Sequence, residues 1–251
     1  MTFAALPELT TVPSVTATQM AEVDRIAIQE LNLPVELLME NASRQIAAAA
    51  RSLLRGTVAG KRVIGLVGTG NNGGDTAGAL RHLVNWGARV CAELAGPQER
   101  LRESTRAQTT RLLLATTWET AIVHDASRKG LRDLDADLLL DGLLGYSARG
   151  ARRDDVARLI AAANTSAVPI LAVDLPSGLD PDTGERTDVA IHAKATVTLA
   201  LPKTGLLTPA AGEAVGELLL ADIGIPHVAF ARVGIETRRL FVDGDLVRIR
   251  H

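Results

Sequence analysis

The sequence predicts an α/β protein of the Rossmann-like, doubly wound class, in which a mostly parallel sheet carries helices on both faces and follows two N-terminal helices. Short runs rich in Val, Ile and Leu alternate along the chain with longer amphipathic runs, as in successive βαβ units. The short runs are apolar throughout, which is typical of parallel strands buried on both faces. With 251 residues, 47% of them hydrophobic, the chain is expected to form a single domain over residues 1–251.

The N-terminal part is expected to be helical after a loose arm of residues 1–13. Residues 16–19 read Thr-Ala-Thr-Gln and fit a capping box at the start of a helix. Pro34 suits the first turn of a second helix, which is expected to end near Gly56. The first helix has apolar residues at helical spacing, at Met20, Val23, Ile26, Ala27 and Leu31.

Alternating strands and helices are expected from Lys61 onwards. The strands are expected at residues 62–68, 88–94, 119–125, 136–141, 168–174, 195–201 and 215–224. The helices between them are expected at residues 74–86, 97–115 and 154–165. The segment from His227 to the end carries mixed signals and receives no assignment.

Composition argues against several classes of partner and compartment. The formal net charge is -2 and aromatic residues make up 2% of the chain, so nucleic acid is not an expected partner. No run approaches the roughly 20 apolar residues of a membrane span, and the first residues lack the features of a signal peptide. One cysteine, Cys91, allows no internal disulfide, so a reducing cytoplasm is the expected location.

Polar residues follow several of the expected strands directly. The glycine-rich segment 68–75 follows the first strand, Asp141 ends the fourth, and Asp174 ends the fifth, three residues before Ser177. In an open parallel sheet, ligands bind beyond the carboxyl ends of the strands, near the point where the strand order reverses. Chain direction therefore places these residues along one edge of the sheet.

The glycine-rich segment matches G-x-G-x-x-G, with Glu93 placed where a dehydrogenase carries its ribose-binding carboxylate. A nicotinamide dehydrogenase is therefore one interpretation. Against it, Asp75 is expected in the first turn of the following helix, where a carboxylate would repel a pyrophosphate. A plain turn, with Asp75 stabilising the helix dipole, is the structural alternative.

Hard oxygen donors and one lysine complete the candidate chemistry. Asn72, Asp141 and Ser177 suit an alkali or alkaline-earth cation and do not suit zinc, although Asp141 and Asp174 could also be simple turn formers. Lys203 is one of only four lysines in an arginine-rich chain. A lysine can lose its proton where an arginine cannot, so Lys203 is either a proton-transfer group or an ordinary surface residue.

Six motifs identify a family. In chain order they are LMENASR, VGTGNNGGD, LLLDGLLG, AVDLPSGLDPDTGE, LPKTGLL and ADIGIP. With these motifs, residues 15–226 resemble the YjeF N-terminal domain family, here in the stand-alone form of an NAD(P)H-hydrate epimerase. The resemblance implies that the protein interconverts the R and S forms of hydrated NADH and NADPH, called NADHX and NADPHX, at ring carbon 6. It also implies a homodimer and a separate S-specific NAD(P)HX dehydratase as functional partner.

The resemblance also implies a role for each site residue. Asp174 and Lys203 would be the catalytic pair. One potassium ion per subunit would bind to Asn72, Asp141 and Ser177. The nucleotide would contact two segments, comprising Asn71, Asn72, Gly73, Gly74 and Asp75, then Gly145, Tyr146, Ser147, Ala148, Arg149, Gly150 and Ala151.

The chain departs from the family pattern at several positions. It has Gly145-Tyr146-Ser147 where the family has Gly-Thr-Gly, and Lys203-Thr204-Gly205 where the family has Lys-Pro-Gly. Tyr146 adds bulk to a loop that approaches the ligand, so it is expected to lie over the mouth of the pocket and narrow it. The alternatives to an epimerase are an inactive family member that binds a nucleotide or protein, and the dehydrogenase. The retained Asp174 and Lys203 favour the epimerase, and the lack of a separate substrate domain disfavours the dehydrogenase.

Overall fold

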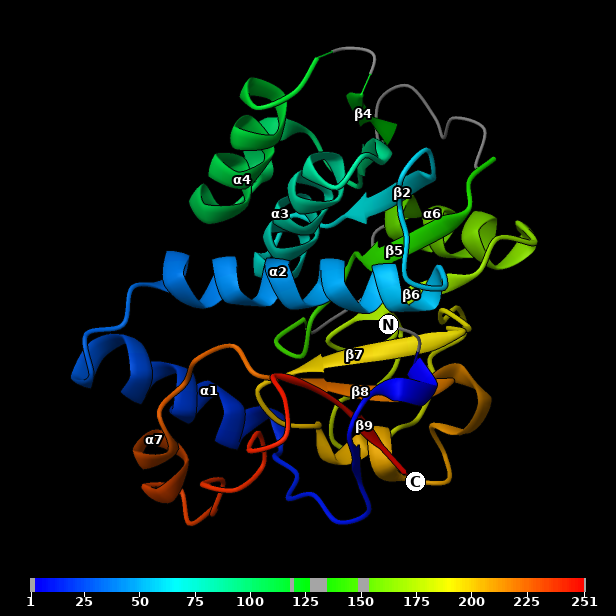
Figure 1. The fold of residues 1–251 in the computed structure, drawn as a ribbon. Helices are drawn as coiled ribbons and strands as arrows, with labels where there is room; N and C mark the ends of the chain where they lie inside the picture. Colours follow the sequence, from blue (N-terminus) through cyan, green and yellow to red (C-terminus); the bar gives the residue numbers. More distant parts are fainter. Residues whose placement is uncertain (1–2, 118–119, 127–134, 149–153, 251) are drawn as a thin grey trace.

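The computed structural model describes residues 3–117, 120–126, 135–148 and 154–250. In these ranges nine strands form one sheet in the order β1-β9-β8-β7-β6-β5-β2-β3-β4 (Figure 1). All neighbouring pairs are parallel except β8 and β9, which are antiparallel. The strands are β1 (Glu8–Leu9), β2 (Arg62–Val67), β3 (Arg89–Leu94), β4 (Ala121–Asp125), β5 (Leu138–Gly142), β6 (Ile170–Val173), β7 (Ala195–Leu199), β8 (Glu217–Ala221) and β9 (Leu246–Ile249).

The α-helices are α1 (Ala17–Arg25), α2 (Val35–Leu53), α3 (Asn71–Asn85), α4 (Glu103–Leu114), α6 (Asp154–Thr165) and α7 (His227–Ala231). The capping box is confirmed, because Gln19 N donates to Thr16 Oγ1 at 3.1 Å and Thr16 N donates to Gln19 Oε1 at 2.9 Å. The first helix continues as a π-helical turn over Ile26–Glu30. The predicted doubly wound class with two N-terminal helices is therefore confirmed.

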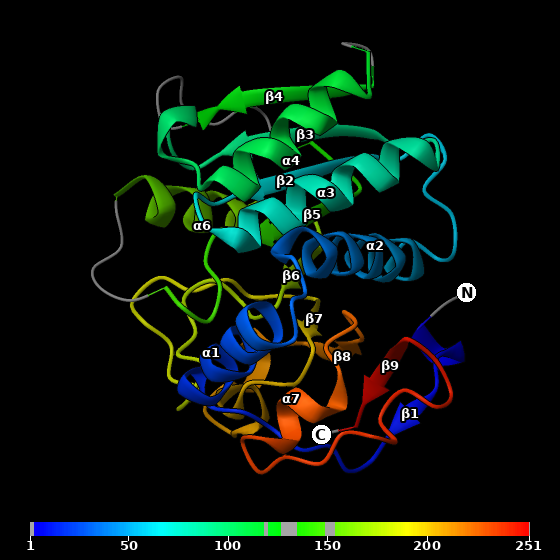
Figure 2. The same cartoon turned by 90° about the vertical axis from the view of Figure 1, so that its left-hand side faces the viewer.

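Side chains alternate between the two faces of the sheet. Val63 and Val67 of β2 belong to the same apolar cluster as residues of α2 and α3. Ile64 and Leu66 of the same strand pack instead with residues of α6. Figure 2 shows α2, α3 and α4 together on one side of the sheet. This two-sided burial explains why the strands read as continuous apolar runs.

The terminal segments differ from the sequence-based expectation. The first residues do not form a loose arm throughout, because Phe3 is buried and Glu8 pairs with Arg248 across β1 and β9. The C-terminal segment, left unassigned from sequence, supplies α7 and the antiparallel strand β9 (Figure 2). A strand as short as β1 carries almost no periodic signal, and its partner lies at the far end of the chain.

The strand order reverses between β2 and β5. From β2 the chain continues outward to β3 and β4, then returns to β5 on the other side of β2. The two loops after β2 and β5 pack tightly, with Gly68 N donating to Gly142 O at 3.0 Å. A Cβ at Gly68 would lie 2.0 Å from the carbonyl oxygen of Leu143, so this glycine is required by the contact between the loops.

Candidate functional site

Asp174 follows β6 in a left-handed backbone conformation, with φ of 69°. Its N–H donates to Val197 O at 2.8 Å, and its Oδ1 accepts from Leu199 N at 3.2 Å. Such a φ costs an L-residue on the order of 1 kcal/mol. These bonds to β7 hold the strained residue and fix the direction of its carboxylate.

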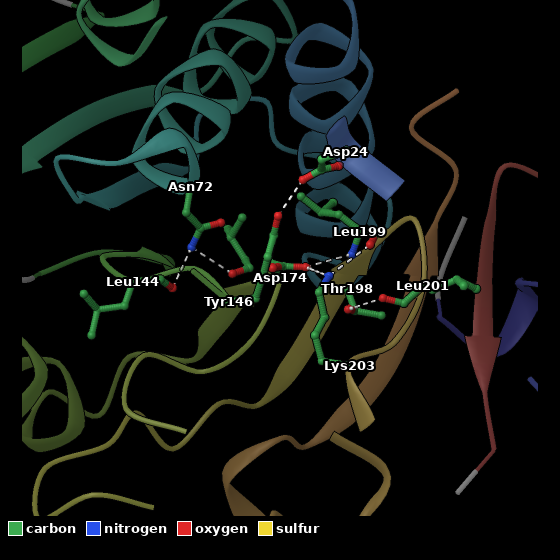
Figure 3. Close-up of polar contacts among 10 residues, drawn as sticks. Asp24, Asn72, Leu144, Tyr146, Asp174, Thr198, Leu199, Leu201 and Lys203 are labelled. Carbon is green, nitrogen blue, oxygen red and sulfur yellow. Dashed lines mark hydrogen bonds and ion pairs between the residues drawn. The ribbon is translucent and has the colours of Figure 1, made fainter. Parts of the chain in front are cut away.

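Lys203 lies in the turn after β7, and the N-terminal segment holds its backbone. Val15 N donates to Pro202 O at 3.0 Å, and Thr204 N donates to Val15 O at 2.9 Å. The lysine is only 1% exposed, and its Nζ donates to Asp174 Oδ1 and, at 3.1 Å, to Leu199 O (Figure 3). The expected convergence of Asp174 and Lys203 is therefore observed, and Lys203 is not a surface residue.

Tyr146 and Asp24 close the wall beside this pair. The Tyr146 hydroxyl donates to Asp24 Oδ2 at 2.6 Å, and Lys203 Nζ lies 5.5 Å from the centroid of the Tyr146 ring (Figure 3). Burial raises the pKa of Asp24, and burial together with Asp24 raises the pKa of Tyr146. Tyr146 therefore lines the cavity, as expected, and lies beside the buried Lys203; that it narrows the mouth stays a prediction.

Asp24 was not among the site residues expected from the sequence, although α1 carries a signal for it. Asp24 lies four residues after Met20 and three before Ala27, both of which are buried. It therefore occupies the apolar stripe of an otherwise amphipathic helix. A carboxylate in that stripe indicates either a buried polar partner or a ligand site.

Asp75 does not lie in the first turn of its helix, as had been expected, because α3 already begins at Asn71. Its side chain is buried and lines a cavity with Asp24 and Asp174. Burial raises the pKa of Asp75 well above its usual value, and the charges of Asp174 and Asp24 raise it further. The helix begins three residues before its expected start at residue 74, so that Asn71, Asn72 and Gly73 also belong to it.

Asp141, Ser177 and Asn72 form a second polar group at the same sheet edge. Asp141 is fully buried and accepts from Ser177 N at 2.7 Å and from Ser177 Oγ at 2.6 Å. Leu144 N donates to Ser177 Oγ at 2.9 Å, and Asn72 Nδ2 donates to Leu144 O and Val173 O at 2.9 and 3.0 Å. Burial raises the pKa of Asp141 to about 6.

A cavity of about 620 Å³ is lined by Asn72 of this group and by the residues of the Asp174–Lys203 pair. Its charged lining residues are the buried or half-buried Asp24, Asp75, Asp174 and Lys203 and the exposed Arg100 and Arg102. A second cavity of about 570 Å³ shares Leu143, Leu144, Gly145, Tyr146 and Ala148 with the first. The loop after β5 therefore lies between the two cavities and lines both of them.

Most of the described residues that are expected to contact a nucleotide line the larger cavity, and two of them do not. Asn71, Asn72 and Asp75 line it, as do all four residues from Gly145 to Ala148. Gly73 and Gly74 do not line it, because the Gly68 carbonyl and the Met39 side chain lie against them. The remaining three expected contacts, Arg149, Gly150 and Ala151, lie outside the described residues.

Glu93 does not occupy the position that a dehydrogenase requires. It is fully buried, accepts from Cys91 Sγ at 3.3 Å, and lies 2.6 Å from His124 Nδ1. It therefore cannot bind a ribose hydroxyl in this arrangement, and it is absent from the two adjoining cavities. The dehydrogenase interpretation therefore loses Glu93 as its ribose-binding carboxylate.

Two kinds of feature are absent from the described residues. None of their helices combines the length and apolar character needed to cross a membrane. In the same residues, no three His, Cys, Asp or Glu side chains gather as a metal-binding cluster. The group of Asn72, Asp141 and Ser177 contains one such side chain, Asp141, and otherwise offers amide and hydroxyl oxygens.

Comparison with known proteins identifies relatives over most of the chain. The family model described as YjeF-related protein N-terminus matches residues 35–205. An NAD(P)H-hydrate epimerase of Dehalogenimonas lykanthroporepellens is 39% identical over 94% of this chain and 92% of its own length. Another NAD(P)H-hydrate epimerase, of Rhodopirellula baltica, is 32% identical over 85% of each chain.

Longer relatives match over part of their length. The chain covers 44% of the bifunctional NAD(P)H-hydrate repair enzyme Nnr of Pyrobaculum aerophilum, at 41% identity. Among solved structures, the crystal structure of yeast Ynu0 (YNL200c) superposes with a TM-score of 0.77 at 23% identity, covering 94% of this chain and all of that one. This structure supports the fold.

Proposed function

Because the chain belongs to the family of YjeF-related protein N-termini, we propose that it is an NAD(P)H-hydrate epimerase, which interconverts the R and S forms of NADHX and NADPHX. The names of the two relatives that match over most of their length support this activity. The reaction inverts one ring carbon and requires no net oxidation. The protein is therefore an isomerase that supports nicotinamide nucleotide repair.

The buried Asp174–Lys203 pair is the observation that carries the proposed mechanism. Epimerisation at a carbon bearing nitrogen and a hydroxyl can proceed by loss and return of the hydroxyl, or by ring opening. Either route requires a proton donor and a proton acceptor beside one carbon. Asp174 and Lys203 are such a pair, and both line the larger cavity. We propose that the hydrated ring lies against them.

The rest of the cavity wall would bind and orient the substrate. Asn71, Asn72 and Asp75 come from the start of α3, and the segment from Gly145 to Ala148 lines the cavity beside Asn72. Tyr146 lies over Lys203, so its ring would shield the reacting pair from water. A shielded pair interacts more strongly than one in water.

We also propose one potassium ion per subunit, held by Asn72, Asp141 and Ser177. The Asp141 carboxylate is fully buried, and among the described residues it accepts hydrogen bonds from N–H and hydroxyl groups without an ammonium or guanidinium partner. A buried charge of this kind requires compensation. The side chains, with the carbonyl oxygens of Leu144 and Val173 beside Asn72, offer the hard donors that an alkali cation prefers. A cation there would neutralise Asp141 and hold the loops after β5 and β6 together.

The homodimer and the separate S-specific dehydratase remain predictions. The repair enzymes named bifunctional are about twice as long as the region that this chain covers, which supports a second activity supplied there by the same polypeptide. Light scattering on the purified protein measures the subunit number. Coupling the protein to an S-specific dehydratase should allow complete recovery of NADH from an R and S mixture.

Following conversion of purified R-NADHX to the S form tests the central proposal. Spontaneous epimerisation provides the baseline, so the rate is measured with and without the protein. We expect the protein to accelerate the conversion in proportion to its concentration. A rate equal to the baseline would instead support the inactive binding module.

A further inference from the structure

The charged groups that line the larger cavity differ in sign and in exposure. The carboxylates of Asp24, Asp75 and Asp174 line it together with Lys203, whose ammonium is already bonded to Asp174 and to Leu199 O. Arg100 and Arg102 also line the cavity, and both are exposed. A phosphate placed among the carboxylates would be repelled, so a phosphate-bearing ligand must place its anionic part toward the arginines.

Both arginines are available for a ligand. No hydrogen bond or ion pair joins either guanidinium to another described residue, and both residues are exposed. Arg102 also acts electrostatically on the Tyr146 hydroxyl, lowering a pKa that burial raises. The positive charge of Arg102 therefore acts on a residue that contacts Asp24 and Lys203, although Arg102 itself is exposed.

The segment that carries these arginines is fixed to the site. Leu101, between them, is buried. Arg102 N donates to Thr69 O of the glycine-rich loop at 2.9 Å, and Arg106 donates to Leu101 O at 3.0 Å. The two guanidinium groups thus extend from an anchored backbone, which reduces the entropy lost when they bind a ligand.

We propose that Arg100 and Arg102 form a phosphate subsite that binds the diphosphate of the dinucleotide, which orients the hydrated ring toward Asp174 and Lys203. This inference rests on the proposed function, which makes the ligand a dinucleotide. Guanidinium groups bind phosphate oxygens through paired hydrogen bonds. The subsite would thereby distinguish a dinucleotide from the free ring or its nucleoside, which lack phosphate.

Titration calorimetry of R100Q/R102Q with NADH tests the subsite without turnover. We expect the Kd for NADH to rise by about tenfold or more, as the loss of charge-assisted hydrogen bonds implies. Reduced nicotinamide riboside, which has the ring and ribose but no phosphate, should bind the variant and the wild type equally. Salt should weaken NADH binding less in the variant, because fewer charges are involved.

The control is R111Q, which removes one positive charge at an exposed position of α4 outside the cavity. Unchanged NADH binding by R100Q/R102Q, or an equal loss in R111Q, would overturn the subsite. An equal loss of riboside affinity would overturn it too, since that result indicates general damage to the pocket. If the wild type does not epimerise R-NADHX but the double variant loses affinity for NADH and not for the riboside, the subsite stands and the proposed reaction is wrong. If the wild type epimerises R-NADHX but the double variant binds NADH as tightly as the wild type does, the subsite is wrong and the proposed reaction stands.

Discussion

Asp141 and Asp174 occupy equivalent positions on neighbouring strands, but their negative charges are compensated by different partners. Each is buried at the carboxyl end of a parallel strand. The loop after β6 covers Asp141 and supplies the N–H and hydroxyl of Ser177, whereas the turn after β7 brings the ammonium of Lys203 to Asp174. The segment that folds over a strand end, and not the strand itself, therefore decides whether its carboxylate binds an internal cation.

Asp75 is a third buried carboxylate, and it lines the larger cavity together with Asp174. It is buried with Asp24 and Asp174 as neighbouring charges, and Lys203 is already bonded to Asp174. Asp174 has an ammonium partner, and Asp141 is bonded to N–H and hydroxyl groups. The ionisation of Asp75 is opposed by burial and also by two neighbouring carboxylates. Substitutions at each position test whether these differences are functional.

The largest effect is expected at the Asp174–Lys203 pair. Asp174→Asn or Lys203→Met should lower the epimerisation rate by about 10²–10⁴-fold, the usual contribution of general acid–base groups. The control, Lys194→Met, changes an exposed lysine just before β7 and should leave the rate unchanged. Full turnover by Asp174→Asn would contradict the assignment.

Folding must be separated from catalysis for this pair. Removing one partner of a buried ion pair leaves the other uncompensated and can cost about 3–5 kcal/mol. The double variant Asp174→Asn/Lys203→Met removes both charges, so it should recover much of the lost melting temperature while remaining inactive. Recovery of activity along with stability would show that the pair acts only in folding.

An intermediate effect is expected for the cation site around Asp141. Potassium should raise the melting temperature of the wild type; at about 100 times its Kd, an ion bound only to the folded state adds roughly 2.7 kcal/mol. Asp141→Asn should lose this response while Asp188→Asn, an exposed control, retains it. Melting curves in potassium chloride and in N-methylglucamine chloride at equal ionic strength provide the measurement. An equal rise of the wild-type melting temperature in both salts would contradict the potassium site.

The smallest effect is expected at Asp75 and concerns the pH dependence of stability. The folded-state pKa of Asp75 is raised, so its stabilising contribution is full below its unfolded pKa, near 4, and is lost as pH rises through the folded value. Asp75→Asn removes this loss and should therefore melt about 2–4 °C higher than the wild type at pH 8, for roughly 1 kcal/mol. The advantage should shrink as the pH falls toward 4. A lower melting temperature at pH 8 would mean that the charged form is stabilised.

Much of the fold and part of the site could be predicted from local pattern and chain direction. Apolar runs placed the strands from β2 to β8, since strands buried on both faces contain few polar residues. Parallel direction then placed Asp141, Asp174 and the glycine-rich loop at one edge. The family motifs identified the potassium ligands and catalytic pair as expectations, and the structure brings each set together without testing its role.

The sequence by itself determined the strand-and-helix order and the edge of the sheet at which polar residues collect, because both follow from neighbours along the chain. Only the tertiary structure decided that Val15 holds the Lys203 turn, that Asp24 bonds to Tyr146, and that β1 pairs with β9. These contacts join segments separated by more than a hundred residues. Their partners are selected when the whole chain packs and buries its polar groups together, so no local window of sequence specifies them.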